Sequence, residues 1–378
     1  MTALPPFELE CYFARWEFAA KYHMTASDAE SMSVPELLAM AAPHDRAAYE
    51  NLWLGYTETR GLPALRDVIA STYANRRADE ILVTTGAEEA IYATLQTVLE
   101  RSSHAIVVTP NYQSHETIAQ SLCDVTGVPL NADDGWSLDI DRVAAAVRPN
   151  TRLMLINFPH NPTGAILSRE RFDTLVGLCR RHGIYLFSDE VFRLLGPEGT
   201  EHLPQVADVY ERGISLGVMS KAYGLPGLRI GWLASADREI LRRIEHTKHY
   251  LSICNAGPSE RLAIIALKAR DRILARNCSI VTQNLQILDQ FFAEHLELFE
   301  WTRPQGGCIS YPRYLGSEGV ERFTSDLVET AGVLLAPASI FQSNLGPTPT
   351  DRFRIGAGRR GIGEGLEAFC GYLKRRRA

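Results

Sequence analysis

Between about residues 80 and 235, short apolar runs alternate with stretches of helical spacing, and this alternation constrains the fold more than any other feature. The strand-like runs occupy residues 105–108, 153–157, 184–187 and 214–219. Strands that are apolar on both faces are typical of a parallel sheet covered by helices. The sequence therefore predicts an α/β fold with a mostly parallel sheet.

The remaining elements are expected before and after this region. Past residue 236 they are helices over 237–298, strands at 309–311 and 333–335, and a last helix near 362–376. Residues 7–18 are rich in aromatic side chains and are predicted to be helical. Ser33 and Glu36 have the spacing of a capping box, which starts a helix.

A lysine and an arginine stand eight residues apart in the glycine- and proline-rich run 220–232. The amine of Lys221 can form a Schiff base with a carbonyl cofactor if its pocket lowers its pKa. Arg229, just beyond, can hold a phosphate by two parallel hydrogen bonds. Because most lysines are solvated surface charges, this run is informative only if the chain supplies the rest of a site.

Polar residues follow two of the expected strands. Asp189 ends the run 184–189, and Asn161 lies in the Asn-Pro-Thr-Gly sequence after the strand at 153–157. Each has an ordinary structural explanation, because aspartate favours helix N-caps and Asn-Pro favours turns. Their order along the chain, upstream of Lys221, favours a shared site at the carboxyl ends of the strands.

A glycine loop comes earlier in the chain, at 84–90, between an apolar strand and a helical stretch. The start of a helix leaves backbone amides unpaired, and these suit a phosphate. Gly86, Ala87 and Glu88 are therefore the candidate phosphate cradle, although an isolated loop of this kind is more often a routine strand-to-helix turn.

Together these segments resemble those of class I and II aminotransferases, which use pyridoxal 5'-phosphate (PLP). The resemblance covers roughly residues 50–378 in the family's order. It implies fold type I, with a large domain built on a mostly parallel seven-stranded sheet and a small α/β domain. The implied division is an N-terminal arm with part of the small domain (1–48), a large PLP-binding domain (49–285) and a small C-terminal domain (286–378).

The resemblance also implies a role for each motif. Lys221 would form the Schiff base and then move the proton at the substrate's α-carbon. Asp189 would keep the pyridine nitrogen protonated, and Asn161 would bind the 3'-oxygen beside the substrate. The other implied cofactor contacts are Gly86, Ala87, Glu88, Ser220 and Arg229 at the phosphate, and Tyr112 stacked on the ring.

Two further positions match the family at the substrate and at a dimer interface. Arg354 lies where the family binds the substrate's α-carboxylate with a bidentate arginine. Tyr56 matches a tyrosine that reaches the phosphate in the neighbouring subunit, which implies a homodimer with shared sites. The segment around Asp28 and Glu30 would cross the mouth of the site, where these carboxylates could meet a basic side chain. Solvated loop carboxylates are the common alternative.

Two positions depart from the family pattern. Typical aminotransferases have a tyrosine three residues after the ring aspartate, and this chain has Phe192, which cannot donate a hydrogen bond. A serine or threonine usually lies three residues before the lysine, and this chain has Val218 there. Ser215 or Ser220 would have to supply the missing hydroxyl. These departures put simple transamination in doubt.

The same segments resemble a narrower group of arginine-modifying PLP enzymes, the capreomycidine synthases and arginine oxidases. Such enzymes use the same carbanion to expel a substituent or to close a ring. The leading hypothesis is therefore an aminotransferase-type enzyme, and the alternative is elimination, cyclisation or oxidation of an arginine-like amino acid. A non-catalytic ligand sensor is disfavoured, since Lys221, Asp189, Asn161 and Arg229 are all present and no basic recognition helix precedes the match.

Composition excludes several other classes. The net charge of −6 gives no reason to expect nucleic acid as a partner. The seven cysteines show no metal-like pairing and suit reduced thiols in a cytosol. Residues 1–6 lack the features of a signal peptide, and no apolar run reaches membrane-spanning length. We therefore expect a cytoplasmic enzyme whose substrate is an amino acid, a small molecule, and no metal.

Overall fold

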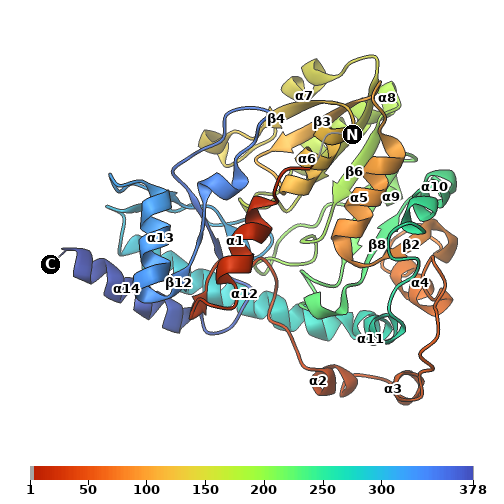
Figure 1. Cartoon of the computed structure of the whole chain (residues 1–378), viewed down its shortest axis with the longest axis horizontal. Coiled ribbons are helices and arrows are strands. Elements are labelled where there is room, and N and C mark those ends of the chain that lie inside the picture. Colours follow the sequence, from red (N-terminus) through yellow and green to blue (C-terminus); the bar gives the residue numbers. More distant parts are fainter. Residues whose placement is uncertain (1–3, 378) are drawn as a thin grey trace.

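The computed structural model describes residues 4–377 and is built around one large sheet (Figure 1). Its seven strands lie in the order β2-β8-β7-β6-β5-β3-β4. Their bounds are β2 (Ile81–Thr84), β3 (His104–Thr109), β4 (Asp124–Pro129), β5 (Thr151–Asn157), β6 (Tyr185–Asp189), β7 (Gly213–Val218) and β8 (Gly231–Ala234). Only β8 runs antiparallel to its neighbours, β2 and β7. The mostly parallel seven-stranded sheet is confirmed.

Helices cover this sheet and complete its crossovers, as the apolar character of the central strands requires. They are α4 (Pro63–Ala70), α5 (Gly86–Val98), α6 (Gln113–Leu122), α7 (Ile140–Ala146), α8 (Arg169–His182), α9 (Val206–Val209), α10 (Arg238–Lys248) and α11 (Gly257–Lys268). Every residue of β2, β3 and β6 is buried, so the sheet is the centre of the core. The predicted strand, glycine turn and helix at 81–98 are confirmed.

The second half of the molecule contains the long helix α12 (Arg270–Ala293), together with α13 (Val320–Ala331) and α14 (Ile362–Arg377) (Figure 1). Its largest sheet has the order β10 (Ile309–Ser310), β14 (Phe353–Gly356), β13 (Ala336–Pro337), and a smaller one pairs β9 (Phe299–Glu300) with β11 (Arg313–Tyr314). The predicted boundary at residue 285 falls inside α12, and the division into domains remains a prediction.

The N-terminal segment joins this C-terminal half. Strand β1 (Tyr22–His23) pairs in parallel with β12 (Val333–Leu334), more than 300 positions later. Before it, α1 (Glu8–Trp16) lies between the two halves of the molecule (Figure 1). After it come α2 (Val34–Leu38), whose Ser33–Glu36 capping box is present as predicted, and α3 (Pro43–Glu50).

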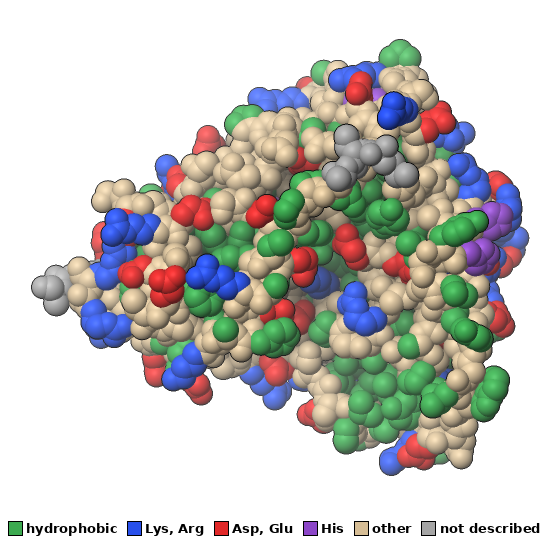
Figure 2. Space-filling model, viewed as in Figure 1, with side chains coloured by type: hydrophobic (Ala, Val, Ile, Leu, Met, Phe, Trp, Pro, Cys, Tyr) green, Lys and Arg blue, Asp and Glu red, His purple; other side chains and the backbone are tan. Residues whose placement is uncertain are grey.

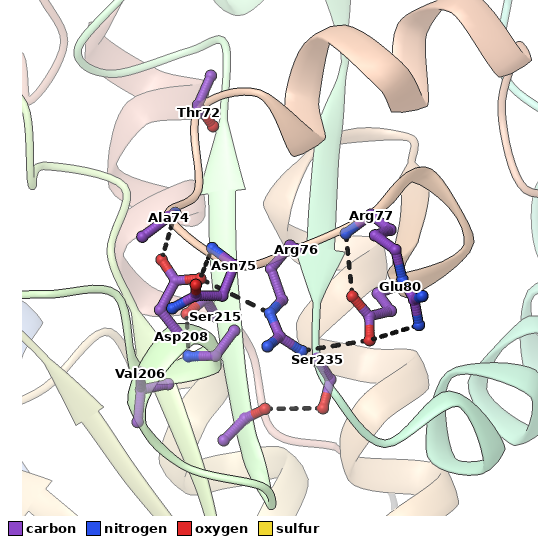
Figure 3. A network of polar contacts seen from close by, with 12 residues as sticks. Thr72, Ala74, Asn75, Arg76, Arg77, Glu80, Val206, Asp208, Ser215 and Ser235 are labelled. Carbon is purple, nitrogen blue, oxygen red and sulfur yellow. Dashed lines mark hydrogen bonds and ion pairs between the residues drawn. The ribbon is translucent and has the colours of Figure 1, made fainter.

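An ion-pair network holds the segment after α4 against the large sheet, as Figure 3 shows. The carboxylate of Asp208 accepts hydrogen bonds of 2.9 Å from the backbone amides of both Ala74 and Asn75. The guanidinium of Arg76 lies 3.6 Å from Asp208 and 3.4 Å from Glu80. These contacts stabilise the packing of the large domain.

Among residues 4–377, no helix is long and apolar enough to cross a membrane. Residues 1–3, which belong to the N-terminal run that lacks signal-peptide features, lie outside the described residues. A cytoplasmic location remains a prediction.

Candidate active site

A pocket of about 360 Å³ opens at the carboxyl ends of β5 and β6 and extends to the loop after β7. It lies between α1 and α5, and Figure 2 shows a hollow with acidic and basic side chains around it near the middle of this face. Most of the predicted cofactor residues line it: Ala87, Glu88, Tyr112, Asn161, Asp189, Phe192, Ser220, Lys221 and Arg229. The volume falls in the range of small-molecule sites.

Lys221 projects into this pocket from the loop that follows β7. Its Nζ donates a hydrogen bond of 2.8 Å to Ser27 Oγ and lies 5.7 Å from the centre of the Phe192 ring. Burial lowers the pKa of Lys221, and nearby Asp28 opposes this effect. A lowered pKa enlarges the fraction of neutral amine, which is the nucleophilic form.

Asp189 ends β6 and is 5% exposed. The neighbouring strand fixes its backbone, because Asn157 Nδ2 donates to its carbonyl oxygen at 3.0 Å. Its carboxylate oxygen Oδ2 lies 3.3 Å from Nε2 of His115, a buried residue of α6. A carboxylate in this position can face a protonated ring nitrogen in the pocket.

The start of α5 and the side chain of Arg229 together form a cradle. Gly86 has a φ of +79°, and a Cβ atom on it would lie 2.5 Å from Nη2 of Arg229. The backbone conformation therefore favours glycine, and the lack of a side chain lets the guanidinium of Arg229 come this close. The amides of the first turn of α5 and an exposed Arg229 side chain converge there, and this arrangement suits a phosphate.

Arg354 is not part of the pocket lining but lies behind Asn161, which is. Arg354, on β14, is fully buried, and its Nη1 donates to Asn161 Oδ1 at 3.1 Å while Nη2 donates to the carbonyl oxygen of Thr25 at 2.9 Å. Burial lowers the pKa of Arg354 to about 10. Within residues 4–377 no carboxylate forms an ion pair with this guanidinium, which is therefore suited to an anionic group brought by a ligand.

The two positions that depart from the family pattern both line the pocket. Phe192 is 2% exposed, and Val218 stands beside it without a hydroxyl. Of the two serines considered as substitutes, Ser220 lines the pocket. Ser215 does not, because its hydroxyl donates to Glu190 and accepts from the amide of Ala207 on the other side of the strand.

The acidic residues at the mouth differ from those expected. Glu30 is not part of the pocket lining, and its carboxylate accepts a hydrogen bond from the amide of Arg360. Asp28 lines the pocket but forms a bidentate ion pair with Arg359, at 2.8 and 2.9 Å. The prediction that Glu30 faces a substrate is therefore corrected, and Asp28 has a protein partner already.

Two carboxylates that the sequence reading missed line the same mouth. Glu10 and Glu17 lie on or just after α1, and with Phe13 they form the face of this segment that lines the pocket. Burial raises the pKa of Glu17. Its nearest ion-pair partner is His23, at 3.9 Å, and burial lowers the pKa of this histidine to about 4, so it is neutral at pH 7.

Tyr112 and Tyr56, the two predicted aromatic contacts, lie in different places. Tyr112 lines the pocket at the start of α6, with its ring 5.2 Å from that of Phe7. Tyr56 is 90% exposed and does not line the pocket. Its predicted role requires a second subunit.

Residues 26–367 match the family model of aminotransferase class I and II. The chain belongs to this family. It is therefore an enzyme of the PLP-dependent aminotransferase scaffold, with the type I fold and pyridoxal 5'-phosphate as its cofactor.

Individual relatives of this aminotransferase-family enzyme include both cyclases and transaminases. It is 26% identical to capreomycidine synthase from Streptomyces vinaceus over 94% of this chain and 90% of that protein. It is 35% identical to arginine–pyruvate transaminase AruH from Pseudomonas aeruginosa over 51% of each chain. The solved structure of the PLP-dependent cyclase OrfR covers 100% of this chain and 99% of its own, with 28% identity and a TM-score of 0.89.

The structure also shows which residues of this family member a reading of motifs could not find. Ser27, His115 and Arg359 belong to no glycine-rich or strand-end motif, and they reach the site through the fold. Among the missed residues, only Glu10 and Glu17 had a recognisable sequence pattern. They are seven positions apart, and such positions lie on the same side of a helix.

Proposed function

We propose that this enzyme binds PLP as a Schiff base on Lys221 and uses the same amine to move the proton at the α-carbon of an amino acid. The observation that carries the proposal is the presence of the Lys221 amine, the Asp189 carboxylate and the Gly86–Arg229 cradle in one pocket. When bound, PLP supplies an electron sink for charge that develops on the α-carbon.

The residues present fit this cofactor. Gly86, Ala87 and the guanidinium of Arg229 would hold the phosphate, with Ser220 and Glu88 beside it. Asp189, held by His115 and Asn157, would keep the ring nitrogen protonated. Tyr112 would lie against the ring and Asn161 would donate to its 3'-oxygen, while Phe192 contributes only apolar contact. The buried guanidinium of Arg354 would bind the substrate's α-carboxylate by paired hydrogen bonds.

We further propose that the substrate has a cationic side chain resembling that of arginine. With Lys221, Asp189 and Arg229 committed to the cofactor, Glu88 placed in the cradle and Asp28 paired with Arg359, the charges left at the mouth are Glu10 and Glu17. Neither forms an ion pair with a lysine or arginine of residues 4–377, although Arg359 lies near enough to offset part of the rise that burial causes in the pKa of Glu17. A guanidinium can satisfy such carboxylates with charge-assisted hydrogen bonds. The name of the AruH transaminase agrees with this substrate class.

The reaction on that substrate has two candidates. Transamination is the first, because the lysine, ring aspartate, asparagine and carboxylate-binding arginine expected for it are all in place. Elimination or cyclisation with retention of the amino group is the second, and Phe192 favours it. The pocket offers no phenol at this position, so negative charge on the 3'-oxygen would be less stabilised than in typical aminotransferases. The names of capreomycidine synthase and the OrfR cyclase support this second candidate.

We also propose that the enzyme is a homodimer. Trp53, Leu54, Tyr56 and Tyr250 are between 81% and 91% exposed, and we call the surface formed by segments 53–56 and 250–253 the apolar face. Figure 2 shows a further group of hydrophobic side chains where Figure 1 places α2 and α11. Large apolar side chains in such a cluster mark an interface. A second copy here would bring Tyr56 toward a neighbouring site.

The test is to add single amino acids to the PLP-loaded enzyme without a keto-acid acceptor and to follow absorbance and products together. Arginine and hydroxyarginines are compared with citrulline, which has the same shape as arginine without the charge. One keto acid released per site with loss of colour would establish transamination. A product that keeps its α-amino group would establish elimination or cyclisation. No spectral change with any amino acid would contradict the proposal.

A further inference from the structure

A buried lysine outside the pocket is the centre of a polar network that the proposed reaction does not use. Lys248 ends α10, and its side chain is 0% exposed. Its Nζ donates to Glu89 Oε2 at 2.9 Å, Ser252 Oγ at 2.6 Å and Asn255 Oδ1 at 3.1 Å. Fully buried lysines are rare, and this one has a partner for each of its three protons.

One branch of the network reaches the phosphate cradle. Glu89 lies in the first turn of α5, and the carboxylate oxygen that binds Lys248 also accepts a hydrogen bond of 2.6 Å from the amide of Thr85. The hydroxyl of Thr85 lies 3.3 Å from Asn255 Oδ1. Thr85 immediately precedes Gly86. Lys248 neutralises the carboxylate of Glu89, and this carboxylate holds the amide of Thr85. The direction of the backbone amides in the cradle therefore depends on Glu89.

The other branch reaches the apolar face. Ser252 accepts from Lys248 and donates its own amide to Glu89 at 3.2 Å, so Lys248 and Glu89 together hold the 250–253 segment. The carbonyl oxygen of Asn255 accepts a hydrogen bond of 2.8 Å from Thr57, next to Tyr56. The Lys248–Glu89 pair thus holds segment 250–253 directly, whereas segment 53–56 is reached only through its neighbour Thr57, which is hydrogen-bonded to Asn255.

The 250–253 segment is strained as well as fixed. Ile253 has a φ of +66° and is 54% exposed. A β-branched residue in the left-handed region is an outlier that persists only where the surroundings hold it. Its amide donates to the carbonyl oxygen of Lys248 at 3.2 Å. The network therefore imposes a shape on an exposed loop that the isolated chain would not adopt.

We propose that Lys248 is a positioning residue that couples phosphate binding at the cradle to the shape of the 250–253 loop on the apolar face. The inference rests on the proposed cofactor site and the proposed second copy. A phosphate that orders Thr85 and Gly86 stabilises Glu89 and, through Lys248, the loop presented to the partner. By linkage, association of two copies strengthens phosphate binding by the same factor.

The experiment compares the enzyme with its Lys248→Met and Arg76→Met variants after removal of PLP. Arg76 is the matched control, because it forms nearly buried ion pairs in the same domain that do not touch the cradle (Figure 3). PLP affinity is measured by titrating the apoprotein, and the dimer dissociation constant is measured by sedimentation with and without PLP. Thermal unfolding reports the stability that each variant loses.

We expect Lys248→Met to weaken PLP binding on the order of tenfold and to remove the effect of PLP on dimer dissociation. Arg76→Met should lose thermal stability while keeping PLP affinity within about twofold. Equal PLP affinity in Lys248→Met and the parent enzyme would overturn the proposal. So would an equal loss in both variants, because that result would reflect general destabilisation.

A second variant covers the case in which Lys248→Met fails to fold because it leaves a buried carboxylate unpaired. Lys248→Met/Glu89→Gln removes both charges and retains an oxygen for the amide of Thr85. In this double variant, PLP should no longer change the dimer dissociation constant. If PLP still changed it, the proposed role of the Lys248–Glu89 ion pair would be overturned. If the parent apoprotein takes up no PLP, the proposed function fails as well. Loss of PLP affinity in the variants alone is a different result, because the parent enzyme then still binds the cofactor.

Discussion

The amine of Lys221 donates a hydrogen bond of 2.8 Å to the hydroxyl of Ser27, a residue 194 positions earlier in the chain. The N-terminal segment therefore contacts the group on which the proposed chemistry depends. A hydroxyl can accept from the charged amine and donate to the neutral one, so Ser27 can orient Lys221 in either protonation state.

Replacing Ser27 by alanine should lower kcat about three- to tenfold, the effect of losing one hydrogen bond at the amine. The KM for the amino acid should change little, because Arg354 and the mouth residues are untouched. Steady-state kinetics measure both constants. Ser27→Thr keeps the hydroxyl and should retain most of the activity, and an unaltered kcat in Ser27→Ala would show that this contact does not serve the reaction.

Lys221→Ala should reduce turnover by about a thousandfold or more, since no other lysine of residues 4–377 lines the pocket. The cradle and Asp189 remain, so PLP should still bind, more weakly and without a covalent bond. Mass spectrometry after borohydride reduction measures the covalent adduct, which should form with the parent enzyme only. Full activity in this variant would end the Schiff-base assignment.

Phe192→Tyr should lower the pH at which the absorbance of the bound cofactor changes. The added phenol would donate to the 3'-oxygen and stabilise negative charge there, so the proton shared with Lys221 is lost more readily. A pH titration of the visible absorbance measures this. An identical titration in both proteins would mean that Phe192 does not face the cofactor.

Glu17→Gln should raise the KM for arginine about three- to tenfold and leave that for citrulline nearly unaltered. Glu8→Gln is the control, because Glu8 lies on the same helix outside the pocket. Burial raises the pKa of Glu17, so the carboxylate is protonated at a higher pH than an ordinary glutamate. The KM for arginine should therefore rise as the pH falls, and Glu17→Gln should flatten that rise.

Acid should destabilise the fold through its buried histidines. Burial lowers the pKa of His160 to about 3, whereas an unfolded histidine has a pKa of about 6.5. The unfolded chain therefore binds one more proton between these values, and stability falls as the pH drops through them, by about 1.4 kcal/mol per pH unit for this residue. Urea unfolding at several pH values gives the free energy of unfolding as a function of pH. This dependence should be shallower in His160→Asn than in the parent enzyme, and equal pH dependence in the two proteins would contradict the prediction.

The sequence predicted the parts of the structure that depend on local pattern. The buried strands around residues 105, 155, 186 and 216 could be predicted because each is apolar on both faces. Strand β4 was not expected, since it lies at the edge of the sheet, is mostly half-buried and begins with the exposed Asp124. The motif residues around Lys221 and Asp189 share one pocket because parallel strands end at the same edge.

Contacts between distant segments could not be predicted in the same way. The partner of Asp28 is Arg359, 331 residues away, and no local signal distinguishes this carboxylate from a free one. His115 reaches Asp189 at the end of β6 from α6, a helix that packs on β3, β4 and α5. The sequence offered Asp28 and Glu30 as carboxylates that could meet a basic side chain. Asp28 lines the pocket and is paired with Arg359, whereas Glu30 is not in the lining, and Glu10 and Glu17 were not considered.

The backbone around β1 has a consequence for how the pocket opens. Beyond the pairing of β1 with β12, the amide of Gly356 donates to the carbonyl oxygen of Met24, and the amide of Glu30 donates to that of Gly358. Ser27 and Asp28 are thereby fastened to the strand that carries Arg354. A displacement of β14 away from the large sheet would carry Arg354, the proposed carboxylate-binding group, together with Ser27, and would break the hydrogen bond from the amide of Ala29 to the carbonyl oxygen of Lys221. Departure of the product and release of the Lys221 amine would then be one movement rather than two.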